Sequence, residues 1–182
     1  MVKKSLFTNM PQREAIEALL RRYPVVDAGT VEAYLAFLGL SGEITAAMEF
    51  QLAHYGTSQA RLRVLIQLSR AEDFSLSPAA LSERLGVKRA TVTGLLDGLE
   101  AGGLIKRGQN ARDGRAINVK LLPKGEKFLD CVIPVRYLAI KTLMSGLSSS
   151  ETGMLLKLLK KMRGGLEGFK VLKKERITRR PL

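Results

Sequence analysis

The 182-residue sequence contains one cysteine and one histidine, and these two counts exclude several kinds of chemistry. The lone cysteine, Cys131, cannot form a disulfide within the chain or a metal site made of several thiolates, and it favours a reducing compartment. His54 is far from Cys131 in the sequence, so no catalytic pair is supported. No glycine-rich phosphate loop follows a predicted strand, and no ligand group has metal-binding spacing. The sequence therefore predicts no enzyme, no cofactor and no metal site.

The sequence also lacks long apolar runs and an excess of acidic residues. Its apolar stretches, such as residues 34–40, are far shorter than the roughly 20 residues that cross a bilayer, and residues 1–11 contain no apolar signal-peptide core. The 30 Lys and Arg outnumber the 17 Asp and Glu, which gives a formal net charge of +13. This charge suits a polyanionic partner, either nucleic acid or an anionic membrane surface. We predict a soluble, cytoplasmic protein without a membrane segment.

Residues 77–122 contain the clearest structural signals, and the first of them predict two short helices. Ser77 is a typical N-cap, Pro78 is tolerated at the first helical position, and Gly86 is suited to end the helix in the left-handed conformation. A second helix is predicted from about residue 89, because apolar residues recur along one face; these are Val92, Leu95, Leu96 and Leu99. Joined by a tight turn, the pair predicts a helix-turn-helix.

A basic hairpin is predicted after the second helix, with strands at 104–107 and 115–122 and a polar connection at 108–114. In the second strand the alternation predicts that Ile117, Val119 and Leu121 face inward and that Asn118 and Lys120 face outward. Helix, turn, helix and hairpin in this order predict a winged helix-turn-helix. In this fold one helix enters a major groove, and the cationic loop reaches the neighbouring backbone or minor groove. The alternative is a small α/β domain with a solvated cationic hairpin.

Helical patterns flank this segment on both sides, so the predicted fold is mainly α, with a small β-hairpin wing. They cover residues 11–23, 29–54, 59–70, 123–145 and 148–163, with a linker at 71–76. The long helix at 29–54 is too apolar for one exposed face, so we predict a helical dimerisation domain built from the N- and C-terminal helices of two copies. The predicted domains are 1–56 for the N-terminal helices, 57–122 for the winged helix-turn-helix, 123–165 for the C-terminal helices, ended by Gly164-Gly165, and 166–182 for a basic tail.

Several motifs resemble the multiple-antibiotic-resistance regulator (MarR) family. They are Leu81-Ser82-Glu83-Arg84-Leu85-Gly86-Val87, Thr91-Val92-Thr93, Leu95-Leu96-Asp97, Leu99-Glu100, Gly103-Leu104-Ile105, Asp113-Gly114-Arg115 and the junction Leu121-Leu122-Pro123-Lys124-Gly125. The resemblance covers about residues 31–162. It implies a dimeric winged-helix transcription regulator, in most cases a repressor. It further implies that DNA is released when a small aromatic or phenolic acid binds between the dimer base and the DNA-binding domain.

The resemblance also implies which residues bind DNA and which bind an effector. The candidate DNA contacts are Ser77, Lys88, Arg89, Thr91, Thr93, Gly94, Arg107, Asn110, Arg112 and Arg115. The candidate effector contacts are His54, Tyr55, Arg61 and Arg63, because a carboxylate or phenolate needs a cationic fork and an aromatic wall. The implied partners are double-stranded DNA with an inverted-repeat operator, a second copy of the chain and a candidate small aromatic acid.

Some residues depart from the family pattern or allow another interpretation. Gly94 and Gly98 stand where the family commonly has basic side chains, and with Ala90 and Ala101 they form a stripe of small residues. The stripe indicates either close approach to DNA or simple tolerance of small residues. Cys131 is interpreted as a packing residue and not as an oxidant sensor. The alternative function is a non-specific nucleic-acid-binding or architectural protein, in which the net charge and the basic tail dominate binding.

Overall fold

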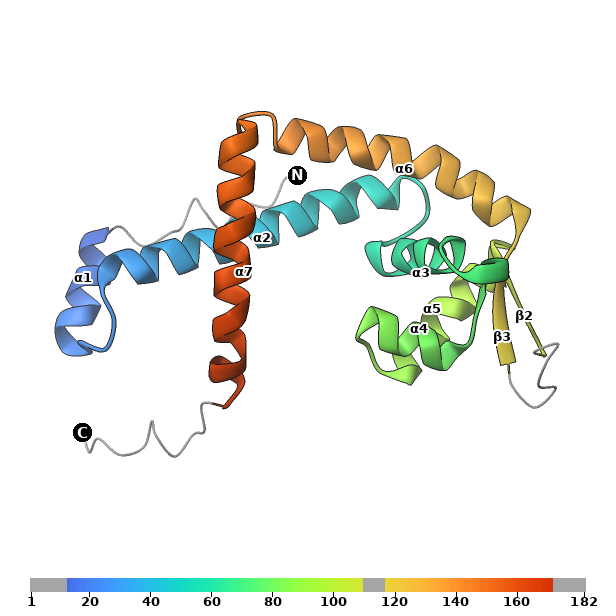
Figure 1. Ribbon diagram of the computed structural model, residues 1–182, viewed down its shortest axis with the longest axis horizontal. Coiled ribbons are helices and arrows are strands. Elements are labelled where there is room, and N and C mark those ends of the chain that lie inside the picture. The colour runs from blue at the N-terminus through green and yellow to red at the C-terminus, as the bar shows by residue number, and fades with distance from the viewer. Residues whose placement is uncertain (1–12, 110–116, 172–182) are drawn as a thin grey trace. The chain divides into compact units, whose positions relative to one another are not determined.

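The computed structural model describes residues 13–109 and 117–171 (Figure 1). Within these ranges the chain is mainly helical with one small sheet, which confirms the predicted fold class. The elements are α1 (Arg13–Arg22), α2 (Ala28–Ala53), α3 (Gln59–Ser69), the short helix η2 (Glu72–Phe74), β1 (Ser75–Leu76), α4 (Pro78–Leu85), α5 (Arg89–Ala101), β2 (Ile105–Gln109), β3 (Ile117–Leu121), α6 (Pro123–Leu143) and α7 (Ser149–Val171). These elements divide into two compact units, with the boundary between Asp130 and Cys131 of α6.

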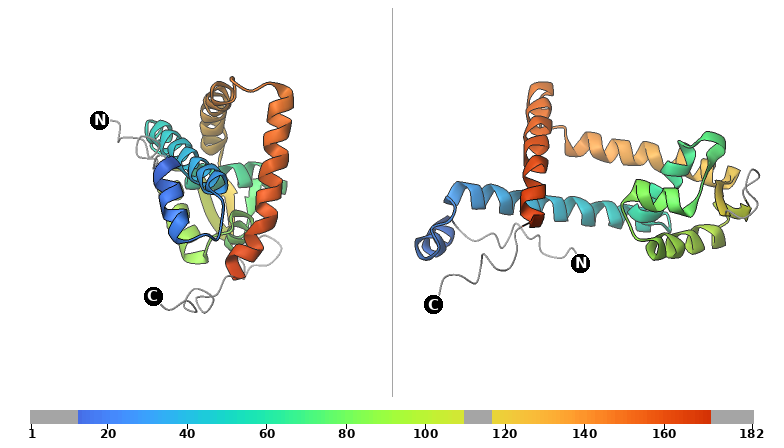
Figure 2. Two further views of the ribbon diagram at one scale, coloured as in Figure 1. Left: turned by 90° about the vertical axis from the view of Figure 1, so that its left-hand side faces the viewer. Right: turned by 60° about the horizontal axis from the view of Figure 1, so that its bottom comes forward.

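The main hydrophobic core of the first unit lies in residues 59–109 and 117–130. We call this part of the chain the reading head. Figures 1 and 2 show α3, α4 and α5 gathered beside the small sheet. Every one of these elements contributes side chains that are almost completely buried; they include Leu62, Leu65, Leu68, Leu81, Val92, Leu96, Leu99, Ile105, Val119 and Leu121. Burial of each such side chain stabilises the fold by about 1.5–3 kcal/mol, so this core holds α5 against the neighbouring helices and the sheet.

The helix ends in the reading head follow the local signals in the sequence. Ser77 Oγ accepts a hydrogen bond from the Ala80 backbone N–H at 3.1 Å, and Pro78 is the first residue of α4. Gly86 ends α4 with φ 67°, a left-handed conformation that suits glycine. Ser58 caps α3 in the same manner, through the Arg61 N–H. The boundaries at Ser77 and Gly86 confirm the prediction and place α4 and α5 as a helix-turn-helix pair.

The sheet has three antiparallel strands in the order β1-β3-β2. The prediction of a linker at residues 71–76 was wrong, because Ser75 pairs with Lys120 and Leu76 with Val119. Two residues are too few for an alternating pattern, so β1 has no signal in the sequence. The inward prediction for Ile117 was also wrong: this side chain is 55% exposed. It pairs with Gln109 at the end of the described ladder, two residues beyond the buried Val119.

Helices α1 and α2 precede the reading head and leave much apolar surface uncovered. Only one residue of the 26-residue α2, Leu52, is buried. Large apolar side chains elsewhere on α2 are exposed, including Tyr34, Phe37, Leu38, Leu40 and Phe50. Exposed apolar area of this extent is unusual for a monomeric protein. The described residues of the first unit therefore leave an apolar surface along α2 uncovered.

The second unit contains the later part of α6 and the whole of α7. The prediction that Gly164-Gly165 ends the last helix was wrong, because α7 continues to Val171. A glycine inside a helix costs about 1 kcal/mol relative to alanine, and the glycines that end helices commonly adopt a left-handed conformation. Neither glycine has a positive φ. Cys131, interpreted as a packing residue, is exposed in the single chain. None of the described helices is both long and apolar enough to cross a membrane.

The start of α7 permits a test by pH. Ser148 Oγ donates to Glu151 Oε2 at 2.6 Å, and the Ser148 backbone N–H donates to the same oxygen at 2.8 Å. These two bonds lower the pKa of the Glu151 carboxyl, so their stabilisation of the helix start is present above the ordinary glutamate pKa. It is lost as the pH falls through the lowered pKa. In an NMR titration, Ser148→Ala should raise this pKa towards its ordinary value. The control Ser150→Ala, whose hydroxyl contacts only Ser148 Oγ, should not.

Candidate nucleic-acid interface

Helix α5 exposes its N-terminal half to solvent. Val92, Leu96 and Leu99 are buried on one side of the helix, which directs the opposite side outward. The candidate DNA contacts in this region, namely Lys88, Arg89, Thr91, Thr93 and Gly94, are all exposed. The structure therefore brings five of the ten predicted contacts together at one end of one helix, with two cations among them.

The exposed face of α5 has polar side chains along its two edges and only small residues along its middle. Arg89 and Thr93 lie one turn apart, and Thr93 Oγ1 donates to the Arg89 carbonyl at 3.2 Å. Thr91 lies on the other side of this face. Between the two sides are Ala90 and Gly94, and a methyl group added at Gly94 would meet nothing within 4 Å. This shape allows a nucleic-acid surface to approach the helix backbone closely.

Arg107 lies on β2 with its guanidinium directed at α5. Its Nη2 is 2.5 Å from Asp97 Oδ1, and its Nε is 3.4 Å from Glu100 Oε2. Glu100 Oε1 also accepts the Arg107 backbone N–H at 2.8 Å, and only 27% of the Arg107 side chain is exposed. The charge of this predicted DNA contact is thus paired with two carboxylates, and the side chain ties the hairpin to α5. Its assignment to DNA stays a prediction.

Arg107→Gln is expected to lower the free energy of unfolding by about 1 kcal/mol, because Asp97 and Glu100 lose their cation. The same variant should leave the salt dependence of DNA affinity nearly unchanged. Arg89→Gln, which removes an exposed cation, should lower that slope by about one. Urea denaturation and DNA titrations at several salt concentrations measure the two effects. An equal fall in slope for both variants would contradict the structural role of Arg107.

The other predicted DNA contacts are less informative. Ser77 is half-buried, and its hydroxyl caps α4 through the Ala80 N–H, so its first role is structural. Asn110, Arg112 and Arg115 lie outside the described residues, and their assignment to DNA stays a prediction.

The four candidate effector residues form two pairs with different neighbours. His54 ends α2 and is exposed; its Nδ1 is 2.9 Å from the Phe50 carbonyl oxygen, and the two rings meet edge to face at 4.9 Å. Tyr55 follows and is also exposed. Arg63 Nη2 donates to the last carbonyl of α4 at 3.2 Å, and the guanidinium of Arg61 lies against α5. The two arginines therefore contact the helix-turn-helix pair, Arg63 at α4 and Arg61 at α5. The assignment of all four residues to an effector stays a prediction.

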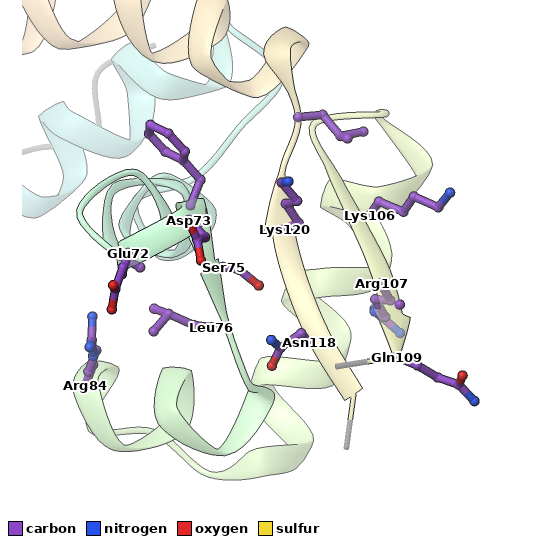
Figure 3. A pocket seen from close by; sticks show the side chains of 14 residues that line it. Glu72, Asp73, Ser75, Leu76, Arg84, Lys106, Arg107, Gln109, Asn118 and Lys120 are labelled. Carbon is purple, nitrogen blue, oxygen red and sulfur yellow. The ribbon is translucent and has the colours of Figure 1, made fainter. Parts of the chain in front are cut away.

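A hollow of about 880 Å³ opens beside the outer face of the sheet (Figure 3). Lys106 and Lys120 are direct cross-strand partners on this face, and Glu72 and Asp73 of η2 also line the hollow. Its charges are therefore of both signs. Of the predicted contacts that lie within the described residues, Arg107 alone lines the hollow. In the described parts of the chain no three His, Cys, Asp or Glu side chains are grouped as metal ligands.

Two further contacts that hold the reading head were missed in the sequence. The carboxylate of Glu49 on α2 accepts the Gln59 N–H at 3.2 and 3.3 Å, which satisfies a free donor at the start of α3. Lys124 Nζ of α6 donates to the Gly102 carbonyl at 2.8 Å, which places a cation at the C-terminal end of α5. Each contact joins residues at least ten positions apart, so no local pattern predicts it.

Comparisons with known proteins agree with this geometry. A family model described as "MarR family" matches residues 55–116. The HTH-type transcriptional repressor YetL of Bacillus subtilis (strain 168) is 32% identical over 162 residues, which cover 89% of this chain and 97% of YetL. The S. aureus MepR–DNA complex has a TM-score of 0.65 at 26% identity, covering 73% of this chain and 96% of that one. AbsC, a MarR family transcriptional regulator from Streptomyces coelicolor, has a TM-score of 0.71 at 19% identity, covering 79% and 97%, and shows the shared fold.

Proposed function

Because the chain belongs to the MarR family of winged helix-turn-helix transcription regulators, we propose that it represses transcription by binding an inverted-repeat operator as a homodimer. Membership in this family assigns the chain to transcription regulators and not to enzymes. The observation that supports DNA binding most strongly is α5, whose buried leucines hold its exposed N-terminal half outward with Lys88 and Arg89. A structural relative, MepR, is in complex with DNA. In this proposal α5 enters the major groove, and the hairpin of β2 and β3 reaches the adjacent backbone.

The proposed dimer accounts for apolar surface that the single chain leaves exposed. In the first unit this surface lies along α2, and in the second unit it lies along α7. A second copy offers the same surfaces, and an isologous pair with two-fold symmetry lets each copy cover the other. Two reading heads in this arrangement would bind half-sites about 34–36 Å apart, or a multiple of that spacing.

We further propose that a small aromatic or phenolic acid releases the protein from DNA. The exposed aromatic rings of His54 and Tyr55 at the C-terminal end of α2 provide a surface for such a ring. Arg61 and Arg63 lie on α3, the next helix, where they contact α5 and α4. If the carboxylate of the acid drew either guanidinium away, that contact with the helix-turn-helix pair would be lost. Calorimetric titration with benzoate-like acids tests this step. Absence of binding at millimolar concentration would contradict it.

The operator proposal is tested by selecting genomic fragments with the purified protein. The expected result is enrichment of an inverted repeat, bound about 10³-fold or more tightly than random DNA at physiological salt. Repeating the selection with aromatic acids present should deplete the same fragments. Equal binding of every duplex would favour the non-specific or architectural alternative, in which the net charge of +13 dominates.

A further inference from the structure

Arg61 of α3 lies across the side of α5 at Gly98. A methyl group added at position 98 would stand 2.7 Å from Arg61 Cζ and 3.0 Å from its Nε, closer than normal contact. The Arg61 side chain is half-buried, and in the described part of the chain it forms no ion pair. The missing side chain at Gly98 thus leaves a space on α5 that the Arg61 guanidinium occupies.

The other glycine on this helix behaves differently. Gly94 is one turn earlier, and a methyl group there would meet nothing within 4 Å. The stripe of small residues is therefore not uniform: Gly94 borders open solvent, whereas Gly98 borders Arg61. Arg61 gives Gly98 a third interpretation, contact with a side chain of the same chain. The two glycines form a matched pair for experiment.

The arginines of α3 contact both helices of the helix-turn-helix pair. Arg63 donates to the Leu85 carbonyl at the end of α4, and Arg61 rests on α5 at Gly98. Arg107 of β2 holds Asp97 and Glu100 on the other side of α5. The exposed face of α5 lies between these two arginine contacts, since Asp97 and Gly98 point about 100° apart around the helix axis. A shift of either arginine would turn the exposed face.

We propose that Arg61 is a positioning residue for DNA recognition: its guanidinium, seated on Gly98, sets the orientation of α5 on α3. This inference rests on the proposed DNA-binding function and adds to it a residue that acts without touching DNA. It also assigns Arg61 a role in the protein without effector. Glycine at position 98 leaves room for the guanidinium, which a large side chain would displace.

A double-mutant cycle tests the proposal with the full-length protein and its selected operator. Gly98→Leu should expel Arg61 and lower the preference for operator over random DNA by about tenfold, and Gly98→Ala should have a smaller effect because the tip of an arginine is flexible. Arg61→Ala provides the space that a leucine side chain at position 98 needs. The double variant Arg61→Ala/Gly98→Leu should therefore have the same operator preference as Arg61→Ala alone. The two substitutions are then coupled by roughly tenfold in this preference.

Gly94→Leu in the same cycle is the control. It adds the same side chain one turn away, where the free protein has open space, so its effect on the free energy of unfolding and that of Arg61→Ala should combine additively. Urea denaturation measures the stability of every variant and shows under which conditions each one is fully folded. Operator and random-DNA affinities are compared under those conditions, so a change in preference is not caused by unfolding. Coupling at position 98 in operator preference, with additive effects on unfolding at position 94, supports the proposal. Coupling in unfolding alone, or no coupling at position 98, overturns it.

Failure of the proposed function gives a different result. If the unaltered protein prefers no duplex over random DNA, then operator recognition itself is wrong, and the inference about recognition is overturned with it. The unfolding cycle would still show whether Arg61 and Gly98 touch. If the unaltered protein has a clear operator preference but the cycle shows no coupling in that preference, only the role of Arg61 is wrong.

Discussion

Gly125→Val is expected to lower the free energy of unfolding by about 3 kcal/mol, one of the largest effects of any single substitution in the reading head. Gly125 is buried in the first turn of α6. A methyl group there would press on the Leu104 carbonyl oxygen and would stand 2.6 Å from Leu121 Cδ1. The Leu104 carbonyl cannot move away freely, because it accepts the Leu122 N–H at 3.0 Å. Valine adds two further methyl groups to the same contact.

The matched comparison is the change from glycine to alanine at two helical positions. Alanine favours a helix by about 1 kcal/mol over glycine, so Gly164→Ala, where a methyl group meets nothing within 4 Å, should stabilise α7. At Gly125 the clash with the backbone outweighs this gain, and Gly125→Ala should be destabilising. Urea denaturation measures the free energy of unfolding of both variants, provided that the dependence of this free energy on urea concentration is unchanged. A stabilising Gly125→Ala would show that the strand-to-helix junction is looser than the structure indicates.

Elements defined by neighbouring residues could be predicted from the sequence. The N-cap at Ser77 and the left-handed Gly86 lie within one turn of the helix ends that they set, and both are confirmed. Of the four apolar residues predicted along one face of α5, Val92, Leu96 and Leu99 are buried, and Leu95 is half-buried. Capping and periodicity act over three or four residues, which is the range that a single sequence displays directly.

Contacts between distant residues could not be predicted in the same manner. In the sequence, Arg107 is one of several cations in a basic hairpin. In the structure it pairs with Asp97 and Glu100, which lie on α5. From the sequence, Gly98 is only a destabilising residue inside a helix; the structure shows that the Arg61 side chain lies against it. In both cases the tertiary neighbour decides the role of the residue. The exposed half of α5 was predictable because burial of one helix face implies exposure of the other.

Leu158→Asp is expected to dissociate the proposed dimer and to lower operator affinity at least 100-fold, about 2.7 kcal/mol. Apolar side chains of α7 recur at helical spacing and are exposed in the single chain; they are Met154, Leu155, Leu158, Leu159, Met162, Leu166 and Phe169. Leu158 lies near the middle of this stripe. A carboxylate there would be buried without a partner in each copy, so both contributions to the interface are lost. Isolated reading heads would then bind each half-site separately.

Gly164→Asp provides the control, because it adds the same carboxylate and the same change in net charge to the opposite side of α7. A methyl group at Gly164 meets nothing within 4 Å, so the new side chain has room. This variant should remain dimeric and retain most of its operator affinity. Analytical ultracentrifugation measures the oligomeric state, and DNA titration at fixed salt measures the affinity. If Leu158→Asp kept the affinity of the unaltered protein, or if the unaltered protein were monomeric, α7 would have no part in a dimer, because a buried unpaired charge cannot be neutral to an interface that contains it.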